Sequence, residues 1–212
     1  MWNHRKGLWR KLTVVIFALG VFIMLTALQR HLIYFPSKAQ AGELSELASR
    51  MGLQAWRDDA GEVIGWKSPG DPDARYRMLV LHGNAGYALN RDYFVTGLRA
   101  LGTLWDVFLF EYPGYGAREG TPSEVNFKAA ATQALEELLA VDSRPVFITG
   151  ESLGSGVASF LASNFPNEVA GLLLVTPFSS LTDVGAHHYP FLPVRTLLSE
   201  RYDSREALSH YG

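Results

Sequence analysis

Short apolar runs alternate with longer, more mixed stretches over most of this chain. Four runs have the length and composition of buried strands: 77–82, 106–111, 146–150 and 170–175. Three intervening stretches predict helices: about 91–101, 123–141 and 152–164. Because strands that alternate with helices form parallel sheets, this order predicts an α/β fold with a mostly parallel sheet and helices on both faces.

Smaller elements are predicted on either side of this alternation. Residues 44–51 place apolar side chains on one helical face, and the alternating segments 53–56 and 62–67 flank Ala60-Gly61 as the strands of a hairpin. After the last apolar run, residues 176–212 include Pro190 and Pro193 and predict a helical excursion that forms part of a cap.

The N-terminal region has the pattern of a membrane segment. Leu12 to Leu28 carries no charge and is almost wholly apolar, although its 17 residues are at the short end of what spans a bilayer. Four basic residues precede it: Arg5, Lys6, Arg10 and Lys11. This excess of positive charge predicts a single-pass membrane protein with a cytoplasmic N-terminus and an extracytoplasmic domain, which would be periplasmic in a Gram-negative cell.

A cleaved signal peptide is the alternative for this segment. The apolar stretch is longer than usual for one, and the small-residue site Ala39-Gln40-Ala41 lies far beyond its end. We therefore expect an uncleaved anchor. The expected organisation is a cytosolic stub at 1–11, a transmembrane anchor at 12–29, a linker at 30–43 and a globular domain at 44–212.

Composition narrows the chemistry. The 212 residues are 48% hydrophobic, enough for one domain with a sizeable core, and the formal net charge of -2 gives no nucleic-acid signature. The absence of cysteine excludes a disulfide scaffold, a thiol nucleophile and a cysteine-based zinc site. His187 and His188 are adjacent and lack the i, i+4 spacing of helical metal ligands. We expect neither a metal nor a cofactor.

A candidate nucleophile follows the strand at 146–150. Residues 150–154 have the pattern G-x-S-x-G, with Ser152 at its centre. Such a serine stands on a sharp turn between strand and helix, and side chains at positions 150 and 154 would collide with neighbouring elements. The pattern therefore predicts that Ser152 is a nucleophile, and the alternative is an ordinary strand–turn–helix junction with a surface serine.

Several segments together resemble one superfamily. They are the stretch 31–36, the loop 82–86, the turn 112–116, the G-x-S-x-G turn at 150–154 and the stretch 177–184. From about residue 30 to 208 the chain resembles the α/β-hydrolases, and among them the membrane-anchored serine hydrolases related to serine aminopeptidases. The resemblance implies hydrolysis of an ester, thioester or amide bond of a small-molecule or peptide acyl substrate through an acyl-enzyme on Ser152, without a cofactor.

The resemblance also assigns an oxyanion hole. In such enzymes the loop after the strand at 77–82 donates one backbone N–H and the residue after the nucleophile donates the other, which here are Asn84 and Leu153. His82, at the end of that strand, is expected to hydrogen-bond the loop rather than to act as the base.

The sequence departs from the family where the acid and the histidine base should follow. The chain ends at Gly212, and neither residue has a counterpart, so we expect a C-terminally incomplete domain without the last strands. The strand at 171–175 would then be a bare apolar edge, open to pairing with a partner chain. A triad of Asp183 with His187, His188 or His210 is one alternative, and a helix N-terminal or capping role for Asp183 is the other.

Three functions stay open from the sequence. The first is an enzyme, a membrane-anchored serine hydrolase whose catalytic core is represented here without its C-terminal third. The second is an anchored binding domain without catalysis, and the third is a half-enzyme that another chain completes.

Overall fold

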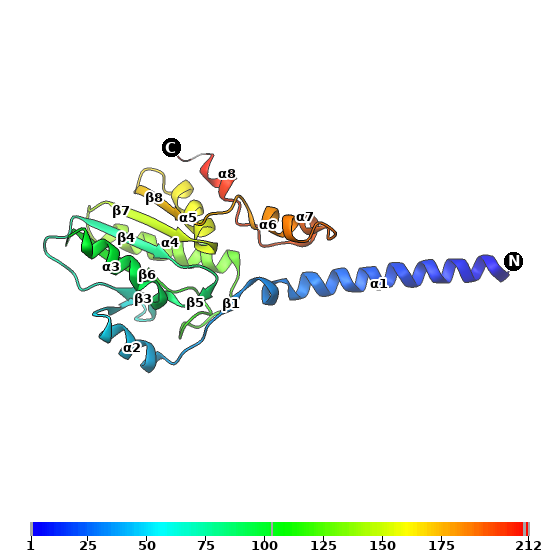
Figure 1. Cartoon of the computed structure of the whole chain (residues 1–212), viewed down its shortest axis with the longest axis horizontal. Coiled ribbons are helices and arrows are strands. Elements are labelled where there is room, and N and C mark those ends of the chain that lie inside the picture. The colour runs from blue at the N-terminus through cyan, green and yellow to red at the C-terminus, as the bar shows by residue number, and fades with distance from the viewer. Residues whose placement is uncertain (1, 103, 210, 212) are drawn as a thin grey trace.

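This computed structural model describes residues 2–102, 104–209 and 211. It has a central sheet with helices packed around it and one long helix that projects from it (Figure 1). The side chains of residues 2–11, 14, 18 and 27 are outside that description. The sheet has the strand order β2-β3-β6-β4-β7-β8. Its strands are β2 (Gln54–Arg57), β3 (Val63–Lys67), β4 (Tyr76–Leu81), β6 (Trp105–Phe110), β7 (Val146–Glu151) and β8 (Val169–Val175).

The pairing directions agree with the predicted topology. Strands β6, β4, β7 and β8 are parallel, whereas β2 and β3 form an antiparallel hairpin that joins the sheet through β6. The mostly parallel sheet and the hairpin are therefore confirmed. Strand β8 lies at one end of this order, and the predicted pairing of its outer edge with a partner chain stays a prediction.

Helices cover both faces of the sheet. Their bounds are α1 (Trp2–Ile33), α2 (Ala41–Arg50), the 3-10 helix η1 (Ala88–Arg91), α3 (Asp92–Ala100), α4 (Glu124–Val141), α5 (Leu153–Asn164), α6 (Leu181–His188), α7 (Val194–Leu197) and α8 (Ser204–Leu208). Figure 1 shows α6 and α7 as a separate excursion beyond the sheet, which agrees with the predicted helical excursion after 176.

Strand β4 shows why both faces are covered. Leu79 and Leu81 belong to a buried cluster that includes residues of α4 and α5. Met78 and Val80 belong to a second cluster, with residues of α2, η1 and α3. Successive side chains of a strand point to opposite faces, so the part of β4 that packs into both clusters, residues 78–81, is apolar at every position. The unbroken apolar run in the sequence is the signature of this position.

Two boundaries differ from the sequence expectation. Helix α1 continues to Ile33, four residues into the stretch expected to be a linker, and α2 begins at Ala41 rather than at Leu44. The earlier start has a local cause, because the backbone N–H of Gln40 donates to the Glu43 carboxylate (3.2 Å) and caps the first turn.

Helix α1 contains the segment expected to cross a membrane. Several of its apolar side chains are exposed, with Val15 at 61% and Phe17 at 73%. Within the described residues, however, no helix has the length and apolar character needed to span a bilayer, so the expected anchor is not supported there. The expected orientation depends on four basic residues whose side chains the structure does not describe: Arg5, Lys6, Arg10 and Lys11.

A second small sheet joins α1 to the globular body. Strand β1 (Phe35–Pro36), directly after α1, pairs in parallel with β5 (Ala85–Gly86), in the loop that follows β4. This pairing holds the end of the long helix at the carboxyl edge of the central sheet.

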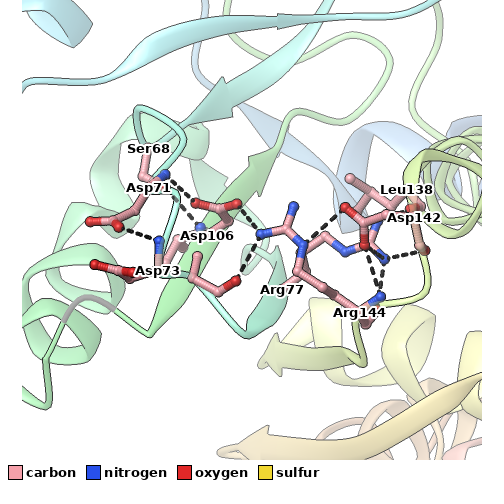
Figure 2. Close-up of polar contacts among 10 residues, drawn as sticks. Ser68, Asp71, Asp73, Arg77, Asp106, Leu138, Asp142 and Arg144 are labelled. Atoms are coloured by element: carbon pink, nitrogen blue, oxygen red, sulfur yellow. Dashed lines mark hydrogen bonds and ion pairs between the residues drawn. The ribbon is translucent and has the colours of Figure 1, made fainter.

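A polar cluster closes the opposite end of the sheet (Figure 2). The buried Arg77, in β4, donates through Nη2 to the carbonyl oxygens of Asp142 (2.8 Å) and Arg144 (2.7 Å), and through Nη1 to that of Leu138. Arg144 in turn pairs with Asp106 of β6 (2.7 Å). Burial lowers the pKa of the Arg77 guanidinium. The cluster therefore fixes the turn between α4 and β7 against β4.

Candidate active site

Ser152 stands on a sharp turn between β7 and α5. Its φ of 50° and ψ of -115° lie outside the ordinary regions for a residue with a side chain. The backbone N–H of Ser152 donates to the carbonyl oxygen of Val175 (2.9 Å), which ties the turn to the end of β8. The predicted strand–turn–helix arrangement is confirmed, and the strained backbone at the serine is the geometry that the motif requires.

The glycines of the motif are needed for the reason that the sequence indicated. A Cβ at Gly154 would lie 2.2 Å from the carbonyl oxygen of Leu81, in the neighbouring strand β4. A Cβ at Gly150 would lie 2.4 Å from the carbonyl oxygen of Gly154. Both contacts are with backbone atoms, which have little freedom to move. Any side chain at either position would therefore displace the turn that presents Ser152.

The two predicted oxyanion donors lie at the same cavity as Ser152. Neither the backbone N–H of Asn84 nor that of Leu153 donates a hydrogen bond to any residue that the structure describes. The Asn84 side chain is held firmly, because its Oδ1 accepts from the Phe35 N–H (3.2 Å) and the Tyr115 hydroxyl (2.9 Å). Its Nδ2 donates to the carbonyl oxygen of Ile33, at the end of α1.

His82 is buried beside the site, and its ring nitrogens are both engaged. Nδ1 donates to the carbonyl oxygen of Gly83 (2.7 Å), and Nε2 lies 3.1 Å from Oε1 of Glu111. The expected hydrogen bond of His82 to the loop is confirmed. The sequence indicated only that Glu111 packs beside the site. Its carboxylate also accepts a hydrogen bond from the Ala88 N–H (3.1 Å), and so joins the loop after β4 to the end of β6.

Glu151, which precedes the candidate nucleophile, is another residue that sequence reasoning missed. It accepts from Nε and Nη2 of Arg91 (2.9 and 3.1 Å) and from the Tyr93 hydroxyl (2.5 Å). Burial raises the pKa of Glu151, but the hydrogen bonds from Arg91 and Tyr93 outweigh it and hold the pKa below its ordinary value. These contacts connect the start of the Ser152 turn to η1 and α3, the two helices that follow the loop containing Asn84.

Asp183 does not form a triad with a histidine among the described residues. Its carboxylate accepts from Ser179 (3.0 Å) and Arg195 (2.8 Å), and these hydrogen bonds lower its pKa. Its backbone N–H donates to the Ser180 hydroxyl, the N-cap of α6 (3.0 Å). The helix-terminal role is thus confirmed for Asp183. His210, the third histidine of the predicted alternatives, lies outside the described residues.

The candidate nucleophile opens onto an uncharged cavity of about 690 Å³. Among the described residues its lining includes Ser152, Asn84, Leu153 and His188, but no Asp, Glu, Lys or Arg. The Ser152 hydroxyl forms no hydrogen bond with any described residue, and His188 is the one described histidine that lines the cavity. The cavity therefore combines a serine hydroxyl, two unpaired backbone N–H groups and apolar walls.

Comparison with known proteins agrees with this architecture. A profile of the alpha/beta hydrolase fold family matches residues 76–203. The uncharacterized protein Rv2307c of Mycobacterium tuberculosis is 39% identical over 209 residues, which cover 92% of this chain and 70% of that protein. The lysophosphatidylserine lipase ABHD12 of Danio rerio is 29% identical over 148 residues, which cover 65% of this chain and 38% of that protein.

Among solved structures, an alpha-beta hydrolase from Vibrio vulnificus superimposes with a TM-score of 0.56 at 22% identity, and the match covers 80% of this chain and 63% of that one. At this identity the likeness concerns the fold alone. The profile match covers more than half of the chain and agrees with the sheet topology, and it establishes that the chain belongs to the α/β-hydrolase fold family.

Proposed function

We propose that the protein is a serine hydrolase that cleaves an ester, thioester or amide bond through an acyl-enzyme on Ser152. The observation that carries this proposal is the strained turn at Ser152, whose hydroxyl shares one cavity with the unpaired N–H groups of Asn84 and Leu153. Ser152 Oγ would attack the carbonyl carbon and lose its proton, the leaving group would depart protonated, and water would then release the acid.

The two N–H groups would stabilise the oxyanion that forms during the attack. A donor of this kind typically contributes about 3 kcal/mol to the stabilisation of the transition state. The N-terminus of α5, which begins at Leu153, adds a favourable dipole for developing negative charge. The Danio rerio relative is a lysophosphatidylserine lipase, and an ester is therefore the first bond to test.

A second candidate function follows from the absence of a described hydrogen-bond partner for the Ser152 hydroxyl. A serine hydroxyl is a weak nucleophile unless a base removes its proton, and no described residue hydrogen-bonds the Ser152 hydroxyl. Without a base, the protein would be a binding domain whose cavity holds an acyl compound and does not cleave it.

Labelling with a fluorophosphonate separates the two candidates. The full chain in detergent is incubated with the probe, digested and analysed by mass spectrometry. We expect an adduct on Ser152 in the folded protein and none after heat denaturation, because only the folded site activates the hydroxyl. If the folded protein carried no adduct on Ser152, this result would contradict the hydrolase proposal and favour the binding domain.

We also propose that α1 anchors the protein in a membrane, with a cytoplasmic N-terminus and the hydrolase domain on the other side. The support is the uncharged stretch 12–28 and its exposed side chains, because transfer of Val15, Ile16 and Phe17 into lipid would remove apolar surface from water. We expect the full chain to stay in the membrane pellet after alkaline carbonate extraction. Release into the supernatant, under conditions that retain a known single-pass protein, would contradict the anchor.

A further inference from the structure

The C-terminal part of helix α1 forms part of the candidate site. The cavity beside Ser152 is lined on one side by Leu25, Gln29, Leu32 and Ile33, all from α1. Residues 25, 29 and 32 are spaced i, i+4, i+7 and so lie on one face of the helix. On another side the lining comes from α6, α7 and the segment between them, which Figure 1 shows next to the C-terminal part of α1.

Specific polar contacts hold this wall in place. The side-chain Oε1 of Gln29 accepts from the Ser199 N–H (2.8 Å), directly after α7. Arg30 pairs with Glu200 (2.9 Å), a carboxylate that is only 3% exposed. The Tyr34 hydroxyl donates to the same carboxylate and lies 2.8 Å from the Tyr202 hydroxyl. A buried, paired carboxylate thus joins α1 to the segment after α7 and fixes two sides of the cavity relative to one another.

The lining indicates what the cavity holds. Its volume of about 690 Å³ lies within the range of about 300–1,000 Å³ that is usual for small-molecule sites. Because the described lining contains no Asp, Glu, Lys or Arg, a charged group in it would have no side chain of opposite formal charge as a partner. A hydrocarbon chain would lose nothing by leaving water, and its burial would be favourable.

We propose that the cavity holds the long acyl chain of an amphiphilic substrate, and that α1 is a wall that sets the length of chain accepted beside Ser152. This inference rests on the proposed hydrolase function. Ile33 lies next to the Asn84 loop, because its carbonyl oxygen accepts from the Asn84 side chain. Leu25 lies eight residues earlier, about 12 Å along the helix axis. The acyl carbonyl is thus placed at Ser152, and the end of the chain is placed toward Leu25.

The test compares two esters on variants of the full chain in detergent. Leu25→Trp fills the distal end of the cavity, and Leu28→Trp is the matched control, because Leu28 is on the same helix, is 45% exposed and does not line the cavity. We expect the ratio of kcat/KM for p-nitrophenyl dodecanoate to that for the butyrate to fall about tenfold or more in Leu25→Trp and to stay unchanged in Leu28→Trp.

An unchanged ratio in Leu25→Trp, or an equal fall in both variants, would overturn the inference. If the wild-type protein hydrolyses neither ester, the hydrolase proposal fails, and a binding measurement still tests the cavity. Dansyl-labelled undecanoic acid should bind the wild type and Leu28→Trp with similar affinity, and Leu25→Trp about tenfold more weakly. Equal affinity for all three proteins would show that α1 does not form this wall.

Discussion

Replacement of Ser152 by alanine is expected to lower kcat/KM for ester hydrolysis by about four orders of magnitude or more. The reason is the loss of the proposed covalent route, because alanine has no oxygen to accept the acyl group. Binding in the cavity and the N–H groups of Asn84 and Leu153 would remain, so a small residual rate is expected. The substitution removes one oxygen that has no hydrogen-bond partner among the described residues, and the fold should be unaffected.

The matched control is Ser163→Ala, also in α5 but near its far end, where the hydroxyl donates to the Phe160 carbonyl oxygen (3.3 Å). It should retain the wild-type rate. Both variants and the wild type are compared by initial rates with a p-nitrophenyl ester and by their thermal unfolding curves. Wild-type activity in a well-folded Ser152→Ala protein would exclude Ser152 as the nucleophile, and with it the proposed mechanism.

Replacement of Arg77 by methionine should have the largest effect on stability, a loss of about 3 kcal/mol or more in the free energy of unfolding. Methionine occupies a similar volume but donates no hydrogen bond. The carbonyl oxygens of Leu138, Asp142 and Arg144 would lose the charged donor that now satisfies them. Because Arg77 lies at the opposite end of β4 from the Asn84 loop, the protein that still folds should keep its specific activity.

Urea unfolding with a constant m-value measures this loss. Arg75→Met is the matched control, because Arg75 is two residues away, is exposed, and its side chain forms no hydrogen bond or ion pair within the described residues. Its stability should change by no more than about 0.5 kcal/mol. Equal shifts of the midpoint in the two variants would mean that the buried cluster contributes little beyond a general effect of charge.

The elements of the fold were predictable where a local physical rule determines them. The apolar run at 77–82 indicated a strand buried on both faces, and β4 has Leu79 on one face and Val80 on the other. The start of α2 was less accurate, because the prediction followed the apolar face from Leu44 and gave no weight to the cap that Glu43 provides before Ala41.

The functional environment was less predictable, because its contacts join distant parts of the chain. Glu200 pairs with Arg30 across 170 positions, and Glu151 pairs with Arg91 across 60. Nothing in the local pattern around either carboxylate distinguishes it from a solvated surface acid. Asp183 illustrates the converse, because its sequence position allowed a catalytic acid, and the tertiary contacts with Ser179 and Arg195 assign it to the start of α6.

The sequence by itself determined the alternation of strands and helices that makes a mostly parallel sheet, and the turn that presents Ser152. Both depend on local sterics and on periodicity, and a side chain at position 150 or 154 would meet backbone atoms. Only the tertiary structure decided what else surrounds that turn: the pairing of Glu151 with Arg91 and the α1 wall of the cavity. These features depend on how distant segments pack together, and the packing energy that places them is spread over contacts that leave no signature in a single stretch of sequence.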